Sequence, residues 1–460
     1  MIFLIFSSIE FLLWFLPIFL IVYGITPRKC RNLTLLVGSI VFYAMGDVRY
    51  LPLLMISILC NYFLGLHLAK RSPKTLWRKK LLLILTLGAN LAVLLWFKDW
   101  GGSAGLPLGI SFYTFQILSY QIDVYRGEVS REYSFLKFAT YVSMFPKLIS
   151  GPITRYGDIS DSLTERTFTV RGLEDGMKLF ILGLAAKVLL ADRVGILWHE
   201  VQVAGFESIS TPLAWLAAIA YSMEIYFDFW GYSLMAMGLG RMMGIELPAN
   251  FRRPYMARSV RDFYRRWHMT LGQWFCRYVY IPLGGSRQGE LRTIFNLLVV
   301  WMLTGIWHGA GWNFLFWGLW FAFFLILEKL FLGDILESVP KVFGRIYTLA
   351  VVLISWVFFA LESPGEILAY LQAMFGMNGI GPVNSLAMFL CNEYLVLLII
   401  ALVACLPVGS LLIHRLKSSK TGPAMALYRV GEKVIPAALL ILSVAYIVDA
   451  SYNPFLYFRF

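Results

Sequence analysis

The chain begins with MIFLIFSSIEFLLWFLPIFLIVYG (residues 1–24), a run of apolar and aromatic side chains long enough to cross a bilayer. The run has no basic leader and no small-residue cleavage site, so we expect a retained membrane span and not a removed signal peptide. Comparable apolar runs recur further along, at residues 81–97, 351–361, 394–413 and 434–448. The sequence therefore predicts a helical membrane protein with many spans.

The composition supports this interpretation. Of 460 residues, 59% are hydrophobic, 16% are aromatic and only 15% are charged, which is unlike a soluble domain. At about 20 residues per span, we expect an all-α polytopic fold with roughly ten or eleven transmembrane or re-entrant helices. We expect a single membrane domain over residues 1–460, divided into N-terminal spans (1–100), a core (107–330), C-terminal spans (343–450) and an aromatic tail (452–460).

The net charge of +13 comes from basic residues that cluster in short loops between apolar runs. This pattern is typical of cytoplasmic loops in membrane proteins, so we expect membrane lipid, and no nucleic acid, as a partner. The clusters lie at residues 27–31, 70–80, 252–292 and 414–420. An alternating path that places all four clusters inside leaves both chain termini outside.

Three regions are too polar for lipid-facing helices and too long for tight turns: 98–172, 244–292 and 362–390. Polar backbone at membrane depth is tolerated only where protein or a water-filled cavity satisfies it. We therefore expect segments such as GLPLGISFYTFQILSYQIDVYRG (105–127) to be re-entrant or to line a cavity. The five cysteines form no CxxC pair, and we expect neither a disulfide framework nor a thiolate metal site.

The segment NFRRPYMARSVRDFYRRWHMTLGQWFCRYVYIPLGGSR (250–287) mixes eight arginines with aromatic residues, and it predicts amphipathic helices at the cytoplasmic face. One hypothesis is a surface belt attracted to anionic lipid. The other is a vestibule for a phosphate-bearing donor, such as a coenzyme A nucleotide or a phosphopantetheine arm, because arginine forks match phosphate oxygens. The candidate donor-binding residues are Arg252, Arg253, Arg265, Arg266 and Trp267.

Two of the five histidines stand out from the others, which lie at predicted span ends. His268 follows the arginine-rich segment, and His308 lies within LTGIWHGAGWNFLFWG (303–318), an almost wholly apolar run. A buried histidine is often a hydrogen-bonded core residue, but the glycines beside His308 let a substrate come close, and Trp307 can wall a dry pocket. An imidazole there is a candidate general base. Neither histidine has a neighbouring ligand at metal-site spacing, so we expect no metal.

Glu224 and Asp228 lie four residues apart in an apolar stretch, which places them on one face of a helix. Buried carboxylates in a membrane are candidate functional groups. They would bind substrate hydroxyls, relay protons in a transporter or channel, or form a structural ion pair with basic residues. The sequence leaves these alternatives open.

The chain ends in YNPFLYFRF (452–460), where aromatic residues dominate. An aromatic belt at the membrane interface explains this composition. The alternative is that the tail inserts into an outer cavity of the protein, which would bring the Tyr457 hydroxyl near the membrane-embedded site.

Taken together, these motifs resemble the membrane-bound O-acyltransferases, and within them the bacterial alginate O-acetyltransferase-like branch. The resemblance covers residues from about 107 to 330 and the end of the chain. It is carried by PLGISFYTFQILSYQIDVYRG (107–127), FPKLISGPITRY (145–156), YFDFWGYSLMAMGLGRMMGIELPANFRRPY (226–255), RDFYRRWHMTLGQWFCRYVYIPLGG (261–285), LTGIWHGAGWNFLFWG (303–318) and the tail.

The resemblance implies that His308 is the catalytic histidine and His268 the second family histidine, in helices arranged around a central tunnel. It implies an acyl donor, acetyl-CoA or a carrier-protein thioester, that enters from the cytoplasm, with no bound cofactor. For the oxyanion we consider backbone amides near Gly309 and Gly311, or the Asn313 amide.

The resemblance further implies a place in the bacterial inner membrane and an acyl group, most plainly acetyl, that passes to an exported polysaccharide. Relatives suggest that Tyr457 relays this group to an extracytoplasmic SGNH-type acyltransferase. A D-alanyl exporter for teichoic acid is the alternative within the family. A transporter or channel that uses Glu224 and Asp228 is the alternative from another class.

Overall fold

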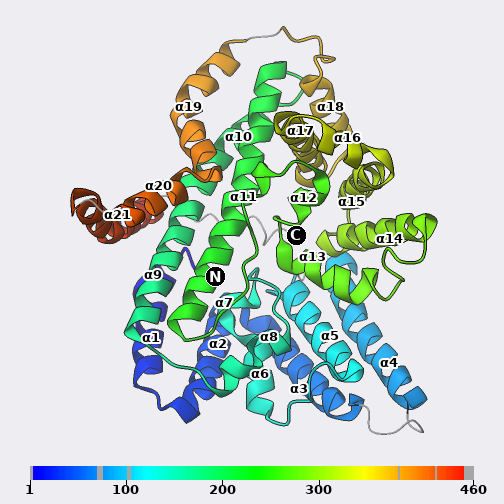
Figure 1. Cartoon of the computed structure of the whole chain (residues 1–460), viewed down its shortest axis with the longest axis vertical. Coiled ribbons are helices and arrows are strands. Elements are labelled where there is room, and N and C mark those ends of the chain that lie inside the picture. The colour runs from blue at the N-terminus through cyan, green and yellow to red at the C-terminus, as the bar shows by residue number, and fades with distance from the viewer. Residues whose placement is uncertain (1–3, 70–75, 101–104, 382–383, 420–421, 450–460) are drawn as a thin grey trace. The chain divides into compact units, whose positions relative to one another are not determined.

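The structure is a computed structural model that describes residues 4–69, 76–100, 105–381, 384–419 and 422–449 (Figure 1). These residues form helices and loops, and they contain no strand. The helices pack into two compact units. The first unit holds the described residues of 1–184 and 232–249, and the second holds 185–231 and 250–449.

The first unit contains nine helices along the chain, and the last turns of α11 complete it. Their bounds are α1 (Leu16–Ile25), α2 (Arg31–Asp47), α3 (Leu51–Leu68), α4 (Leu76–Leu95), α5 (Ile110–Arg126), α6 (Phe135–Ser143), α7 (Phe145–Leu148), α8 (Tyr156–Thr164) and α9 (Val170–Ala185).

Aromatic rings form the core of the first unit. The Phe145 ring, at the start of the short helix α7, lies 5.4 Å from Phe15 and 5.1 Å from Phe19, with both pairs nearly perpendicular. The backbone N–H of Phe145 donates to the Ser39 hydroxyl of α2 at 3.0 Å. Edge-to-face packing and this hydrogen bond together hold α1, α2 and α7 against one another.

Helix α5 contains the segment that the sequence predicts to be re-entrant or cavity-lining. It is instead one continuous helix, and every residue from Ile110 to Gln121 is buried. The Gln121 amide nitrogen donates to the Asn61 carbonyl of α3 at 2.7 Å. A neighbouring helix therefore provides a partner for the Gln121 amide within one continuous helix, and residues 110–126 do not turn back.

The second unit contains the remaining helices. Their bounds are α10 (Asp192–Ala204), α11 (Thr211–Met242), α12 (Val260–Tyr264), α13 (Met269–Phe275), α14 (Glu290–His308), α15 (Trp312–Leu327), α16 (Gly333–Ser338), α17 (Lys341–Ala360), α18 (Pro364–Met374), α19 (Ser385–Cys405), α20 (Val408–Ser418) and α21 (Gly422–Asp449). One-turn π-helical segments follow α13 at Cys276–Tyr280 and α15 at Glu328–Leu332.

The helical hairpin α14–α15 positions the site described below (Figure 1). Two glycines allow its helices to touch. A Cβ atom on Gly318 would lie 2.4 Å from the Trp301 carbonyl oxygen, and one on Gly305 would lie 2.5 Å from the Phe314 carbonyl oxygen. No side chain fits at such distances, so the two backbones meet directly and the hairpin turn is short.

Seven helical stretches are long and apolar enough to cross a membrane: Arg28–Leu68, Leu76–Lys98, Glu290–His308, Trp312–Ser338, Lys341–Ala360, Ser385–Cys405 and Gly422–Asp449. A shorter apolar stretch covers Phe11–Ile25. Large apolar side chains such as Trp14, Val396 and Ile441 are exposed on these helices, as expected where lipid is the solvent. The chain is therefore a multi-pass membrane protein.

Candidate active site

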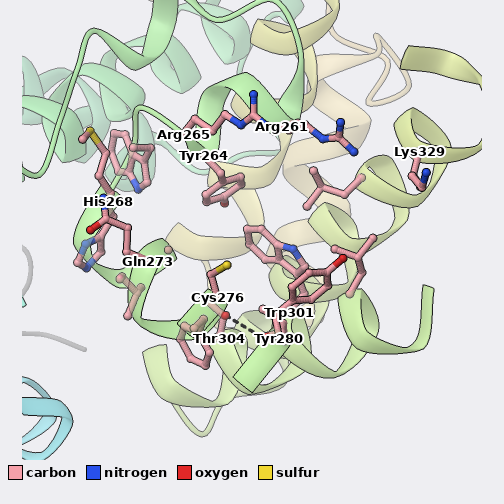
Figure 2. Close-up of a pocket in the computed structure, with 18 of the residues that line it drawn as sticks. Arg261, Tyr264, Arg265, His268, Gln273, Cys276, Tyr280, Trp301, Thr304 and Lys329 are labelled. Atoms are coloured by element: carbon pink, nitrogen blue, oxygen red, sulfur yellow. Dashed lines mark hydrogen bonds between the residues drawn. The ribbon is translucent and has the colours of Figure 1, made fainter. Parts of the chain in front are cut away.

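The two histidines singled out by the sequence line one cavity of about 730 Å³ in the second unit. The cavity lies among α12, α13, α14, α15 and the π-helical segments that follow α13 and α15. Figure 2 shows His268 on one side of the view and Lys329 on the other, with Arg261 and Arg265 along one edge. A single space thus brings together two imidazoles, three cationic side chains and several aromatic rings.

His268 is held in an unusual backbone conformation. Its φ is 43°, in the left-handed region that residues with a side chain rarely adopt, and only 3% of the residue is exposed. Backbone hydrogen bonds on both sides maintain this turn: Met269 N–H donates to the Asn250 carbonyl at 2.9 Å, and Arg252 N–H donates to the Arg266 carbonyl at 2.9 Å. A strained turn held this firmly is typical of functional sites.

The Asn250 side chain determines which nitrogen of His268 carries the proton. Its Oδ1 atom accepts from the backbone N–H of Thr270 at 3.3 Å and lies 3.1 Å from Nδ1 of His268. Because a backbone N–H can only donate, the Asn250 atom at this point is the oxygen. Nδ1 of His268 therefore donates, and Nε2 of the neutral ring carries the lone pair.

Aromatic packing keeps His268 neutral. The Phe229 ring of α11 lies 4.7 Å away and nearly perpendicular, and Trp307 lies 6.2 Å away. Burial lowers the pKa of His268 to about 3, because the charged ring would lose its hydration. At neutral pH the ring is neutral and can donate and accept hydrogen bonds.

His308 is the last residue of α14, at the turn of the hairpin. Its ring is walled by Trp317 at 4.9 Å and Phe359 at 5.3 Å, both nearly perpendicular to it. Trp307 lies 4.8 Å from His308 and also contacts His268. Trp307 does not line the cavity itself, but it connects the two imidazoles through one indole ring.

Cationic side chains line the same cavity, but only one of the four arginines predicted to bind the donor is among them. Arg265 lines it, whereas Arg266 forms an ion pair with Asp262 at 2.8 Å and Arg253 donates to the Ser410 hydroxyl at 2.5 Å. Arg252 is exposed and does not line the cavity either. Trp267, also predicted, does line it.

Sequence reasoning missed Arg261 and Lys329, which line the cavity with Arg265. Arg261 lies four residues before Arg265, the C-cap residue of α12, and this helical spacing, which predicts both on one face, was a usable signal. Lys329 follows the apolar helix α15, and no local pattern connects it with α12. The segment 244–292 forms short helices, among them α12 and α13, which carry buried aromatic residues and cavity residues.

Sequence reasoning also missed Glu328. Its side chain connects the residue after α15 to the start of α12 through hydrogen bonds. Its carboxylate accepts the backbone N–H groups of Val260 at 2.6 Å and Arg261 at 3.0 Å, at the start of α12. An anion at a helix N-terminus is favourable, because the first N–H groups have no partner within the helix. This contact sets the position of Arg261 relative to Lys329.

The two carboxylates of α11, half-buried Glu224 and buried Asp228, do not line the cavity. Asp228 forms an ion pair with Lys187 at 2.6 Å, and Lys187 also contacts Asp192 at 2.7 Å. The Glu224 carboxylate packs so closely over Gly195 that a Cβ there would lie 2.6 Å from it. Of the alternatives left open by the sequence, the geometry supports the structural ion pair for Asp228.

Asn313 and Tyr457 are the remaining candidate residues from the sequence. Asn313 is 2% exposed, and neither atom of its amide has a hydrogen-bond partner among the described residues, but it does not line the cavity. Tyr457 and the rest of the tail lie outside the described residues. In the part of the chain that the structure describes, no group of three His, Cys, Asp or Glu side chains is placed to hold a metal ion.

Comparison with known proteins relates this geometry to one family. The sequence model of the membrane-bound O-acyltransferase family matches residues 68–364, which include both histidines. The probable alginate O-acetylase AlgI of Pseudomonas putida is 39% identical over 383 residues, which cover 78% of this chain and 78% of that protein. The peptidoglycan O-acetyltransferase of Helicobacter pylori is 34% identical over 431 residues, with coverage of 82% and 81%. The teichoic acid D-alanyltransferase of Streptococcus thermophilus is 28% identical over 242 residues, with coverage of 49% and 57%.

The pKa of His268 generates a prediction about stability. Between pH 6.5 and about 3 the unfolded chain binds a proton at this residue and the folded chain does not. The free energy of unfolding therefore does not depend on His268 well above pH 6.5, and at pH 5 it is lower by about 2 kcal/mol because of this residue. We expect His268→Gln to reduce the loss of thermal stability between pH 7.5 and pH 5, measured by unfolding of the purified protein in detergent.

The control is His199→Gln, which removes an exposed histidine of α10. This variant should lose stability on acidification as the wild type does. An equal pH dependence in the wild type and His268→Gln would contradict the neutral, buried state of His268.

Proposed function

Because the chain belongs to the membrane-bound O-acyltransferase family, we propose that it transfers an acetyl group from a cytoplasmic thioester towards an exported polysaccharide, with His308 as the general base. That the chain is a multi-pass membrane acyltransferase follows from the family and the apolar helices. The observation that supports the finer proposal best is the shared cavity, in which two imidazoles lie with Arg261, Arg265 and Lys329.

Acetyl is proposed over D-alanyl on the extent of similarity. The alginate and peptidoglycan acetyltransferases match about four fifths of the chain, whereas the teichoic acid D-alanyltransferase matches 49%. The acceptors named for these relatives, alginate and peptidoglycan, are cell-surface polymers of sugars, so a sugar hydroxyl is the proposed final acceptor. Which polymer it belongs to is left open.

The proposed reaction needs one proton acceptor and a dry site. The acceptor hydroxyl attacks the thioester carbonyl, a C–O bond forms, and the C–S bond breaks. His308 takes the hydroxyl proton and returns it to the departing thiolate. Trp317 and Phe359 against the His308 ring exclude water that would otherwise hydrolyse the thioester.

The cationic side of the cavity fits a donor that carries phosphate. The guanidinium groups of Arg261 and Arg265 and the ammonium group of Lys329 can bind the phosphates of coenzyme A or of a phosphopantetheine arm. The cavity volume of about 730 Å³ lies within the usual range for small-molecule sites. We therefore place the donor with its phosphates at the cations and its acyl group at the histidines.

His268 is the proposed second histidine. With Nδ1–H donating to Asn250, its Nε2 atom has the lone pair available to accept a hydrogen bond from the donor or the acceptor. A neutral ring suits this role. A permanent positive charge there would stabilise the departing thiolate and so promote breakage of the thioester before the acceptor binds. We propose that it orients a reactant while His308 moves the proton.

The C-terminal tail, residues 452–460, is the proposed first acceptor of the acetyl group. We place the protein in the bacterial inner membrane and propose that the Tyr457 hydroxyl accepts the acetyl group first. An extracytoplasmic SGNH-type acyltransferase would then pass the group on to the polysaccharide. A transporter that uses Glu224 and Asp228 is not proposed, because the family is enzymatic and Asp228 is paired with Lys187.

Loss of the general base should slow transfer strongly. We expect His308→Ala to lower the rate of acetyl transfer from acetyl-CoA by about 10²- to 10⁴-fold, measured as thiol release by purified protein in lipid nanodiscs. His199→Ala, on α10, is the matched control and should keep the wild-type rate. A wild-type rate for folded His308→Ala would remove His308 from the chemistry.

Loss of a donor-binding cation should affect affinity more than turnover. We expect Arg265→Gln and Arg261→Gln each to raise the KM for acetyl-CoA about tenfold or more, because each removes a charge-assisted hydrogen bond, while kcat changes little. Arg266→Gln is the matched control, since Arg266 is paired with Asp262 outside the cavity. An equal rise in KM for all three variants would point to a general charge effect and contradict the site.

The tail relay predicts a covalent adduct. After incubation with acetyl-CoA, intact-mass analysis of the C-terminal peptide should detect an acetyl ester that is absent from Tyr457→Phe and from His308→Ala. The same adduct in Tyr457→Phe would place the acceptor elsewhere. Transfer to a polymer by Tyr457→Phe at the wild-type rate would remove the relay while leaving the role of His308 in place.

A further inference from the structure

Two buried arginines in the first unit form a cluster that the proposed reaction does not use. Arg31 is the first residue of α2, and Arg166 lies in the loop between α8 and α9. The guanidinium carbon of each lies 5.6 Å from the centre of the Tyr23 ring of α1, and that of Arg31 also lies 5.6 Å from the Phe168 ring. The two residues are only 8% and 9% exposed.

Several N–H groups of the two guanidiniums are buried without a hydrogen-bond partner in the described part of the chain. Nε and Nη1 of Arg31 and both Nη atoms of Arg166 are buried and have no hydrogen-bond partner among the described residues. No carboxylate in that part of the chain forms an ion pair with either arginine, although Glu165 is next in sequence to Arg166 and is exposed. The Tyr23 hydroxyl donates to the Met243 carbonyl at 2.8 Å, and its oxygen can accept from Arg166, which leaves the other N–H groups of the two arginines to be satisfied.

Stacking on the Tyr23 ring compensates only part of the free energy that is lost when the two guanidinium groups are buried. Buried charges require an opposite charge or several hydrogen bonds, because they lose their hydration. The two guanidiniums are also close enough to repel: burial lowers the pKa of Arg166, the charge of Arg31 lowers it further, and Tyr23 opposes both effects only in part. A bound anion would satisfy the unused N–H groups and cancel the repulsion.

The surrounding backbone is arranged to keep the two arginines together. The Asn32 amide donates to the Leu163 carbonyl at 2.8 Å, which ties the chain before Arg166 to the start of α2. The N-cap residue of α2, Cys30, makes no side-chain capping hydrogen bond. The 3-10 turn Arg28–Cys30 leads directly into α2, and the Arg31 backbone N–H donates to the Arg28 carbonyl, so the backbone fixes Arg31 at this turn.

We propose that Arg31 and Arg166 bind one phosphate group, carried either by an anionic phospholipid headgroup or by a soluble phosphate compound. Planar guanidinium forks match phosphate oxygens, and two forks provide enough donors for one group. The pair lies where the apolar stretch Phe11–Ile25 ends and the stretch Arg28–Leu68 begins, beside the exposed Arg28 and Lys29. This is the level at which lipid headgroups and soluble anions both reach a membrane protein.

The test measures stabilisation of the delipidated full-length protein in detergent. Thermal unfolding is followed during titration with short-chain phosphatidic acid, with diacylglycerol of the same chains as the control. A parallel titration uses inorganic phosphate against chloride at equal ionic strength. A ligand that binds the folded state raises the unfolding temperature with concentration. We expect stabilisation by at least one phosphate compound and none by either control.

Variants locate the site. Arg31→Gln and Arg166→Gln should each weaken the apparent affinity about tenfold or more, as expected for the loss of a charge-assisted contact. Arg28→Gln, an exposed arginine three residues from Arg31, should bind as the wild type does. If the Gln variants do not fold, Arg31→Lys and Arg166→Lys keep the charge but lose the fork, and they should also bind more weakly.

Each outcome has a definite meaning. A response to phosphatidic acid alone assigns a lipid headgroup, and a response to inorganic phosphate, with or without the lipid, assigns a soluble phosphate. The proposal is overturned if the wild type responds to neither compound, or if Arg28→Gln loses affinity as much as the two buried positions. It is also overturned if Arg31→Gln and Arg166→Gln are folded and bind as tightly as the wild type.

Discussion

The direct backbone contact between α14 and α15, at Gly305 and Gly318, is the constraint on which the site depends. It keeps the hairpin tight, so that His308 at the end of α14 lies against Trp317 of α15. At the other end of α15, the Glu328 carboxylate holds the start of α12. Helix α12 then carries Arg261 and leads through Arg265 to His268, so one hairpin positions both imidazoles and the cations.

Charge in this protein is placed where an apolar interior can tolerate it. His268 is buried and stays neutral, and Asn250 determines which ring nitrogen carries the proton. Lys187 and Asp228 are buried together, so their charges compensate. Arg31 and Arg166 fit neither pattern, since they are buried, charged and without an ion pair in the part of the chain that the structure describes. This contrast is the reason to look for an external anion at these two residues.

The sequence predicts the helical class, the apolar spans and the two histidines, because these depend on local composition and on motifs. It predicts α5 less well: polar residues in an apolar run favour a re-entrant segment, yet residues 110–126 form one helix in which Gln121 finds a partner in Asn61 on α3. That partner is distant in sequence. The same limit applies to Asp228, whose ion pair with Lys187 depends on tertiary packing. The density of arginines in the arginine-rich segment did not identify the ones that line the cavity. Helical spacing would have selected Arg261 together with Arg265.

The central claim is that one cavity holds the thioester donor with its acyl group at the histidines and its phosphates at the cations. A structure of the wild-type protein with a non-hydrolysable acetyl-CoA analogue tests this most directly. The account predicts phosphates beside Arg261, Arg265 and Lys329, and the acyl carbon beside His308. A donor bound outside this cavity, or with its acyl carbon away from both histidines, would contradict it.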